Sequence, residues 1–180
     1  MRCGGDIALI YSMFRAEKHD AGPIAALVNS AYRGESSRQG WTTEDDLLAG
    51  LRTDTEEILR LISSEDSMFL LCKAEAELIG SVHLQKQAEQ VCLGMLAVSP
   101  ALQERDIGKQ LLAAAELAAQ ETWAVNKAVM TVIACRNELI AFYQRRGYRR
   151  TGVSKAFPVN PGLWTPKVTD LRLEILEKIL

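Results

Sequence analysis

The sequence predicts a single α/β domain in which helices cover both faces of a mixed sheet. Strand-like and helix-like segments alternate only in the second half of the chain, which favours a mixed sheet over a wholly parallel one. The 180 residues are 48% hydrophobic and 24% charged, which suits one globular domain with its own core. We expect an N-terminal extension at residues 1–9 and the domain at residues 10–180.

Apolar periodicity and turn residues define the expected elements in chain order. Strands are expected at residues 10–16, 68–72, 78–84, 91–98, 127–135, 148–157 and 168–176. Helices are expected at residues 20–32, 106–122 and 137–146 and after two capping patterns, Thr43–Asp46 and Thr53–Glu56. The first of these capped helices would present Leu47, Leu48 and Leu51 on one side. Residues 33–41 are expected to form a loop, with Asp20 and Gly147 at helix ends.

Charge and cysteine content exclude several classes of protein. The formal net charge of −2 gives no electrostatic reason to expect a nucleic acid or an anionic membrane as partner. No apolar stretch approaches the roughly 20 residues of a membrane span, and the N-terminus lacks a secretory pattern, so we expect a cytoplasmic protein. The cysteines form no Cys-x-x-Cys pair and only two histidines are present, so no metal site is expected. Three of the four cysteines lie in apolar runs and are expected to be buried thiols: Cys72, Cys92 and Cys135.

Residues 93–109 are the segment that indicates chemistry. They read as a buried strand, a tight loop and the start of a helix, and a helix start presents unpaired N–H groups and partial positive charge. Both favour a phosphate or pyrophosphate. Gly108 would let a ligand approach the backbone, and Arg105 and Lys109 would add positive charge. Taken by itself, a glycine at a helix start is more commonly a packing residue.

This segment resembles the acetyl-CoA pyrophosphate loop of the GCN5-related N-acetyltransferase (GNAT) superfamily. The matching positions are Val98, Pro100, Gln103, Gly108, Leu111 and Leu112. Asp106 stands where the family pattern has its first glycine, and a carboxylate beside a pyrophosphate is unfavourable unless it points away or pairs with Arg105. A second block, residues 137–148, is similar to the family's Asn…Tyr-x-x-x-Gly helix, although Asn137 lies one residue closer to Tyr143 than is common. The expected element order matches the family fold over about residues 10–176.

The resemblance implies a single-domain GNAT fold and an N-acetyltransferase. It would transfer acetyl from acetyl-CoA directly to the primary amine of a small molecule in a ternary complex. The Leu96 N–H would polarise the thioester carbonyl, and Tyr143 would protonate the departing thiolate. The expected cofactor-binding residues are Leu96, Ala97, Val98, Gln103, Arg105, Asp106, Ile107, Gly108, Lys109, Asn137 and Tyr143.

The sequence indicates the general base and the acceptor-binding residues less specifically than the cofactor-binding loop. His83 has a suitable ordinary pKa of about 6.5, but a cross-strand packing role is the more common one for such a residue. Glu35, Glu44 and Asp45 are further candidates, although a solvated capping face is the more common role for such residues. A base is unnecessary if the pKa of the amine is low or if water relays the proton. Residues expected to face the acceptor are Tyr32, Arg33, Glu35, Arg38 and Trp41. Arg33 or Arg38 would hold a carboxylate of an amino-acid-like acceptor, or would simply be solvated.

A second class of function also fits the sequence. A non-catalytic acyl-CoA-binding or sensing module of the same fold would explain Asp106 and the absence of a carboxylate on the strand before the loop. Such a module would bind the cofactor without releasing its thiol in the presence of any amine. The sequence also leaves open whether the chain forms a homodimer.

Overall fold

The structure, a computed structural model, describes residues 10–180, so the expected extension at residues 1–9 lies outside them. One seven-stranded sheet has the order β1-β3-β4-β5-β6-β9-β7. Its strands are β1 (Ser12–Arg15), β3 (Ser67–Ala74), β4 (Glu77–Gln87), β5 (Gln90–Val98), β6 (Lys127–Ile133), β7 (Arg149–Ala156) and β9 (Arg172–Ile179). Neighbouring strands are antiparallel except β5 and β6, which are parallel. The predicted mixed sheet is therefore confirmed.

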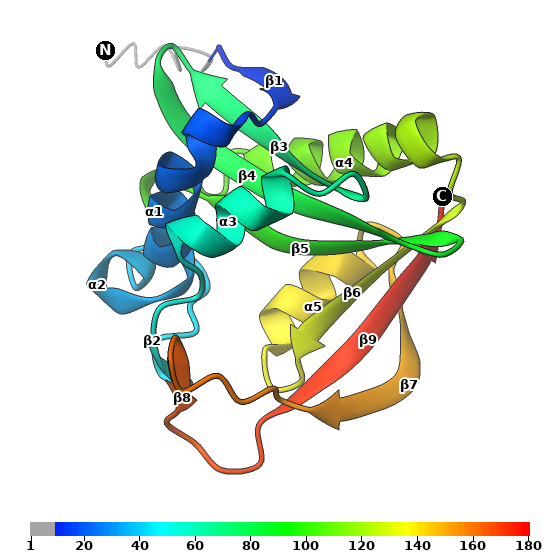
Figure 1. The fold of residues 1–180 in the computed structure, drawn as a ribbon. Coiled ribbons are helices and arrows are strands. Elements are labelled where there is room, and N and C mark those ends of the chain that lie inside the picture. Colours follow the sequence, from blue (N-terminus) through cyan, green and yellow to red (C-terminus); the bar gives the residue numbers. More distant parts are fainter. Residues whose placement is uncertain (1–9) are drawn as a thin grey trace, which may run out of the picture.

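Helices cover both faces of this sheet, as the sequence predicted (Figure 1). On one face lie α1 (Ala21–Tyr32) and α3 (Thr55–Ile62); on the other lie α4 (Ile107–Trp123) and α5 (Asn137–Gln144). The short elements are η1 (Lys18–Asp20), α2 (Gly34–Ser37) and η2 (Pro100–Leu102), together with a small sheet of β2 (Leu48–Gly50) and β8 (Trp164–Pro166). No helix within residues 10–180 is both long and apolar enough to cross a membrane.

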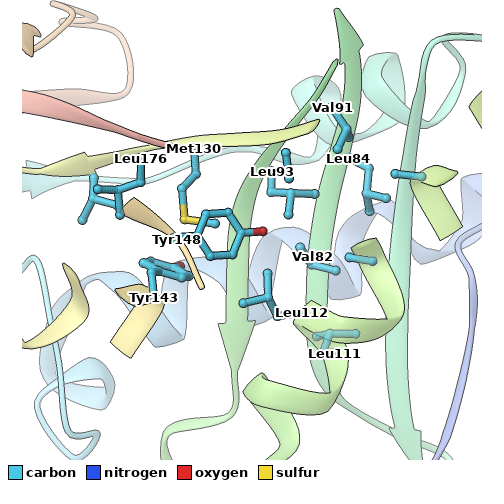
Figure 2. Close-up of a cluster of buried hydrophobic side chains, with 14 of the residues drawn as sticks. Val82, Leu84, Val91, Leu93, Leu111, Leu112, Met130, Tyr143, Tyr148 and Leu176 are labelled. Carbon is cyan, nitrogen blue, oxygen red and sulfur yellow. The ribbon is translucent and has the colours of Figure 1, made fainter. Parts of the chain in front are cut away.

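The larger apolar core lies between the sheet and α4. Leu111 and Leu112 of α4 pack against sheet residues such as Val82 and Leu93 (Figure 2). Tyr143 and Tyr148 close the same cluster, with their ring centres 5.9 Å apart. Burial of these side chains, each contributing about 1.5–3 kcal/mol, holds α4 and α5 on one face of the sheet.

The two central strands separate part-way along their length. β5 and β6 pair only at Val91 with Ala128 and at Cys92 with Val129. Further along β5, the ladder with β4 shifts register between Ser81 and His83, and Met95 has a φ of +46°. The shift places an additional residue on β5, which is a β-bulge. The sheet therefore opens beside residues 94–98.

The prediction of a helix after Thr43 is wrong. Leu48–Gly50 instead forms β2, antiparallel to β8, so that Leu48 pairs with Pro166. Leu48 is fully buried among Ile133 and Leu173. The hydroxyl of Thr43 accepts the N–H of Asp45, whereas a capping box requires that of Asp46. No helix follows, because the next residues gain a strand partner far along the chain.

Three local expectations also need correction. Residues 33–41 are not wholly a loop, because they contain the single-turn helix α2. Asp20 does not cap α1 with its side chain, since its carboxylate accepts the N–H of Glu17 at 2.9 Å within η1. Cys72 is buried as expected, and its burial raises the pKa of the thiol to about 11. The other two cysteines expected to be buried are not: Cys92 is half-buried, and Cys135 is exposed in the turn after β6.

Candidate active site

Two cavities meet where β5 and β6 separate. The first, here called the α4 cleft, is lined by the end of β5, residues 102–104 and 106–109, and α5. The second, here called the β8 pocket, is lined by Arg33, Glu44, Arg52, Phe157 and Trp164 together with apolar residues of β5 and β6. The residues that line both cavities are Tyr32, Leu96, Arg136, Leu139 and Tyr143. A molecule in one cavity can therefore approach a molecule in the other at these five residues.

The start of α4 presents free backbone N–H groups to the α4 cleft. Asp106, the N-cap, has a φ of +60° and its side chain makes no capping hydrogen bond. The first-turn N–H groups, up to that of Lys109, therefore have no intrahelical partner. A φ in the left-handed region favours glycine, and Asp is one of the few other residues that tolerate it. Glu104, with a φ of +66°, shares this strained geometry.

Side chains from three segments complete the α4 cleft. Gln103 accepts the N–H of Trp41 at 3.0 Å and donates to the carbonyl of Val98 at 3.1 Å. Lys109, Arg145 and Arg146 supply positive charge to the lining. Arg146 lies over the ring of Phe142, with its guanidinium carbon 3.5 Å from the ring centre. The cleft therefore combines free N–H groups with cations, which is the chemistry that binds phosphates.

Tyr32 and Tyr143 lie at the junction of the two cavities. The Tyr32 hydroxyl donates to the carbonyl oxygen of Leu96 at 3.2 Å, which fixes the strand beside the bulge. Tyr143 packs its ring edge-on against Phe142. It packs in the same way against Tyr148 (Figure 2). Its hydroxyl makes no hydrogen bond to any residue within 10–180, and burial raises the pKa of this phenol well above its usual value. Tyr143 therefore holds its proton at neutral pH beside Leu96.

A buried ion-pair network forms one wall of the β8 pocket. Glu44, 6% exposed, accepts from Arg136 at 2.8 Å and from Arg33 at 3.1 Å. Arg136 also donates to the Thr42 hydroxyl at 2.7 Å. The sequence offers Glu44 only as one of several candidates for the base, and no pattern in it indicates Arg136. Because both oxygens of Glu44 accept from guanidinium groups, its role is to hold the arginines in place.

His83 lies away from both cavities. Its Nε2 is 2.8 Å from the Ser67 hydroxyl and its ring stacks on Phe69, with ring centres 4.7 Å apart. Burial, reinforced by the charge of Arg52, lowers its pKa to about 4. The structure thus matches the packing alternative and does not support His83 as the base, because an imidazole closed in by strands cannot reach an acceptor.

The remaining predicted residues divide into two groups. Lining the cavities are Tyr32, Arg33, Trp41, Leu96, Ala97, Val98, Gln103, Asp106, Ile107, Gly108, Lys109 and Tyr143, with Trp41 in the α4 cleft and not in the β8 pocket. Lining neither are Glu35, Arg38, Asp45, Arg105 and Asn137. Arg38 is exposed and pairs with Asp45 at 2.6 Å, which leaves it turned from the pocket. Asn137 is exposed on the first turn of α5, and its neighbour Arg136 lines both cavities instead.

Comparison with known proteins gives the family. Residues 45–159 match the family model described as Acetyltransferase (GNAT) domain, so the chain belongs to the GNAT acetyltransferase family and is an acyltransferase. This confirms the resemblance drawn from the sequence. A search of curated proteins found no match.

Solved structures agree with the fold at low sequence identity. An acetyltransferase of the GNAT family from Streptococcus pneumoniae is 16% identical with a TM-score of 0.66, covering 95% of this chain and 99% of that one. The ribosomal-protein-S18-alanine N-acetyltransferase from Escherichia coli is 14% identical with a TM-score of 0.68, covering 94% of each chain. A putative acetyltransferase from Salmonella typhimurium, solved with its cofactor acetyl-CoA, is 17% identical with a TM-score of 0.66, covering 94% of each chain.

Proposed function

We propose that the protein transfers the acetyl group of acetyl-CoA to the primary amine of a small molecule, directly and within a ternary complex. The observation that carries this proposal is the junction of the two cavities at Leu96 and Tyr143. It lets a thioester in the α4 cleft and an amine in the β8 pocket meet without a covalent enzyme intermediate.

The α4 cleft fits acetyl-CoA. The free N–H groups around Gly108 suit the pyrophosphate. Lys109, Arg145 and Arg146 suit the phosphate charges. The backbone of residues 96–98, next to the bulge and beyond the last pairing with β6, suits the amide groups of the pantetheine arm.

The chain's own residues then perform the chemistry. Acetyl-CoA supplies the activated acyl group as a thioester. The backbone N–H of Leu96 donates to the thioester oxygen, where negative charge develops. As the amine nitrogen bonds to the carbonyl carbon and the carbon–sulfur bond breaks, Tyr143 gives its proton to the sulfur. The nitrogen loses its own proton to water, because the Glu44 oxygens are engaged by Arg33 and Arg136.

Two measurements test this function. Isothermal titration with acetyl-CoA should show saturable binding, and CoA-thiol release should follow addition of one class of amine from a panel of amino acids, polyamines, aminoglycosides and peptides. Lys109→Gln should weaken acetyl-CoA binding about five-fold, because it removes a cation from the cleft, whereas Lys18→Gln on the exposed η1 should not. Binding without thiol release from any amine would favour a sensing module over an enzyme. No binding at millimolar acetyl-CoA would refute both.

A further inference from the structure

The β8 pocket contains more positive than negative charge. Its charged lining residues are Arg33, Arg52 and Arg136, with Glu44 as the one carboxylate among the described residues. A single carboxylate cannot neutralise three guanidinium groups. Charges that face a cavity and lack a partner attract an oppositely charged ligand.

The hydrogen bonds show which arginines are already engaged. Arg33 directs Nε and Nη2 to Glu44, at 3.2 and 3.1 Å, and Nη1 to the carbonyl of Leu51 at 3.2 Å. Arg136 donates from Nη1 to Glu44 and from Nη2 to the Thr42 hydroxyl. Its buried Nε–H has no acceptor within residues 10–180. Arg52 forms no ion pair with any residue in that range. Arg52 and, in part, Arg136 are therefore the groups whose charge is left for a ligand.

These arginines lie close to the point of acetyl transfer. Arg136 lines both cavities. The guanidinium carbon of Arg52 lies 5.8 Å from the ring centre of Tyr32, and the hydroxyl of that same tyrosine lies 3.2 Å from the Leu96 carbonyl oxygen. Tyr32 therefore lies between the guanidinium of Arg52 and the strand at Leu96. An anionic group bound beside Arg52 would lie in the same pocket as the reacting amine.

Most of the remaining lining of the pocket is apolar. Met130, Leu139, Phe157, Trp164 and Leu173 line it, and the rings of Phe157 and Trp164 meet edge to face at 6.4 Å. Such a lining favours a hydrocarbon or aromatic group by burial, and outside the charged cluster it presents few hydrogen-bonding groups to a hydroxyl-rich sugar.

We infer that the acceptor is an α-amino acid with an apolar side chain, whose carboxylate is bound by Arg52 and Arg136 while its amine faces Leu96 and Tyr143. This inference rests on the proposed acetyl transfer. A guanidinium matches a carboxylate with paired hydrogen bonds. The same charges repel polyamines and aminoglycosides, which would have to bring further cations beside Arg52.

The experiment compares acceptors that differ only in charge. Thiol release is measured with leucine, with leucinamide, which replaces the carboxylate by a neutral amide, and with spermidine. Leucine should have a kcat/KM at least about ten-fold above leucinamide, because hydrogen bonds to a charged group are lost in the amide. The amine of leucinamide is less basic than that of leucine, so a larger fraction of it is neutral and able to react at a given pH. A preference for leucine therefore does not come from amine reactivity and reports recognition of the carboxylate.

Variants assign the preference to Arg52. Arg52→Gln should raise the KM for leucine about ten-fold and reduce the leucine-to-leucinamide ratio, and Arg52→Lys should lie in between because it keeps the charge but not the planar fork. Arg60→Gln, on the exposed side of α3, is the matched control and should leave the ratio unchanged. Titration with acetyl-CoA shows that each variant is folded, since Arg52 does not line the α4 cleft.

The outcomes separate this inference from the function on which it rests. Equal or better use of leucinamide or spermidine would overturn the inference and leave acetyl transfer standing. A ratio unchanged by Arg52→Gln, in a variant that still binds acetyl-CoA, would also overturn it. If the protein released no thiol with any amine, the proposed function and the inference would both fail.

Discussion

Gln103 fixes the backbone of Trp41, because its side-chain oxygen accepts the Trp41 N–H at 3.0 Å. The other end of the same amide donates to Val98 at the end of β5. One side chain thus joins the segment after α2 to the strand that lines the α4 cleft. The indole of Trp41 then packs near Phe142, with ring centres 5.9 Å apart, and covers part of the cleft.

A side chain at Gly40 would displace the side chain of Gln103. A Cβ at Gly40 would overlap the side-chain oxygen of Gln103. We therefore expect Gly40→Ala to lower the free energy of unfolding by about 1 kcal/mol and to weaken acetyl-CoA binding, since the Gln103 amide must move and give up its hydrogen bonds to Trp41 and Val98. Urea denaturation and titration measure the two effects.

Two variants test this explanation. Gly22→Ala is the matched control, because nothing lies within 4 Å of its added Cβ and alanine is the better helix former in α1. In a Gln103→Ala background, Gly40→Ala should lower the free energy of unfolding much less, because the atoms that the new Cβ would overlap are absent. A cost that is the same in both backgrounds would show that Gln103 is not the obstacle.

Asp106 places a negative charge beside the proposed pyrophosphate site. Asp106→Asn and Asp106→Gly should each lower the Kd for acetyl-CoA about five-fold, which corresponds to about 1 kcal/mol of repulsion in a water-exposed cleft. Glu121→Gln, which removes a carboxylate from the far end of α4, is the control. A higher Kd in both Asp106 variants would mean that the carboxylate helps to shape the loop.

The sequence predicted those features that depend on neighbouring residues. The strands at 67–98 and the helix at 107–123 arise from local apolar patterns, and the Gln103–Gly108 loop is a short motif. Gly147 has a φ of +91° after α5, as its predicted place at the helix end requires.

The features that the sequence did not predict join residues far apart in the chain. β2 pairs with β8 more than 100 residues later, and a three-residue strand has too little pattern to be distinguished from a helix. Glu44 binds Arg136 across 92 residues, so its burial had no local signal. The only local indication of Arg136 was its place beside Asn137, a residue expected in the site.

Tyr143 should be needed for turnover but not for folding. Tyr143→Phe should lower kcat about 100-fold, because general acid catalysis is lost, and should leave the Kd for acetyl-CoA within about two-fold. Since its hydroxyl has no partner within residues 10–180, the variant should unfold at an unchanged urea concentration. Because burial raises the pKa of the phenol, wild-type kcat should not fall through loss of this proton between pH 7 and about pH 10. A kcat within three-fold of wild type would exclude Tyr143 as the acid.

His83 should make the fold sensitive to acid. Its pKa is lowered from 6.5 to about 4 by burial, so between these values the unfolded chain binds more protons than the folded one. The contribution of His83 to the free energy of unfolding is fully present above pH 6.5, where the imidazole is neutral in both states. It is lost as the pH falls toward 4, and the loss at pH 4.5 is about 2–3 kcal/mol. Urea denaturation at a series of pH values measures this slope.

The variant His83→Gln isolates this contribution. Glutamine does not titrate, and it keeps a polar group within reach of the Ser67 hydroxyl, so the free energy of unfolding should depend less on pH between 6.5 and 4.5. His19→Gln, at a side chain 73% exposed, controls for removal of a histidine as such. If the slopes of wild type and His83→Gln coincide, His83 is not the group that titrates on unfolding.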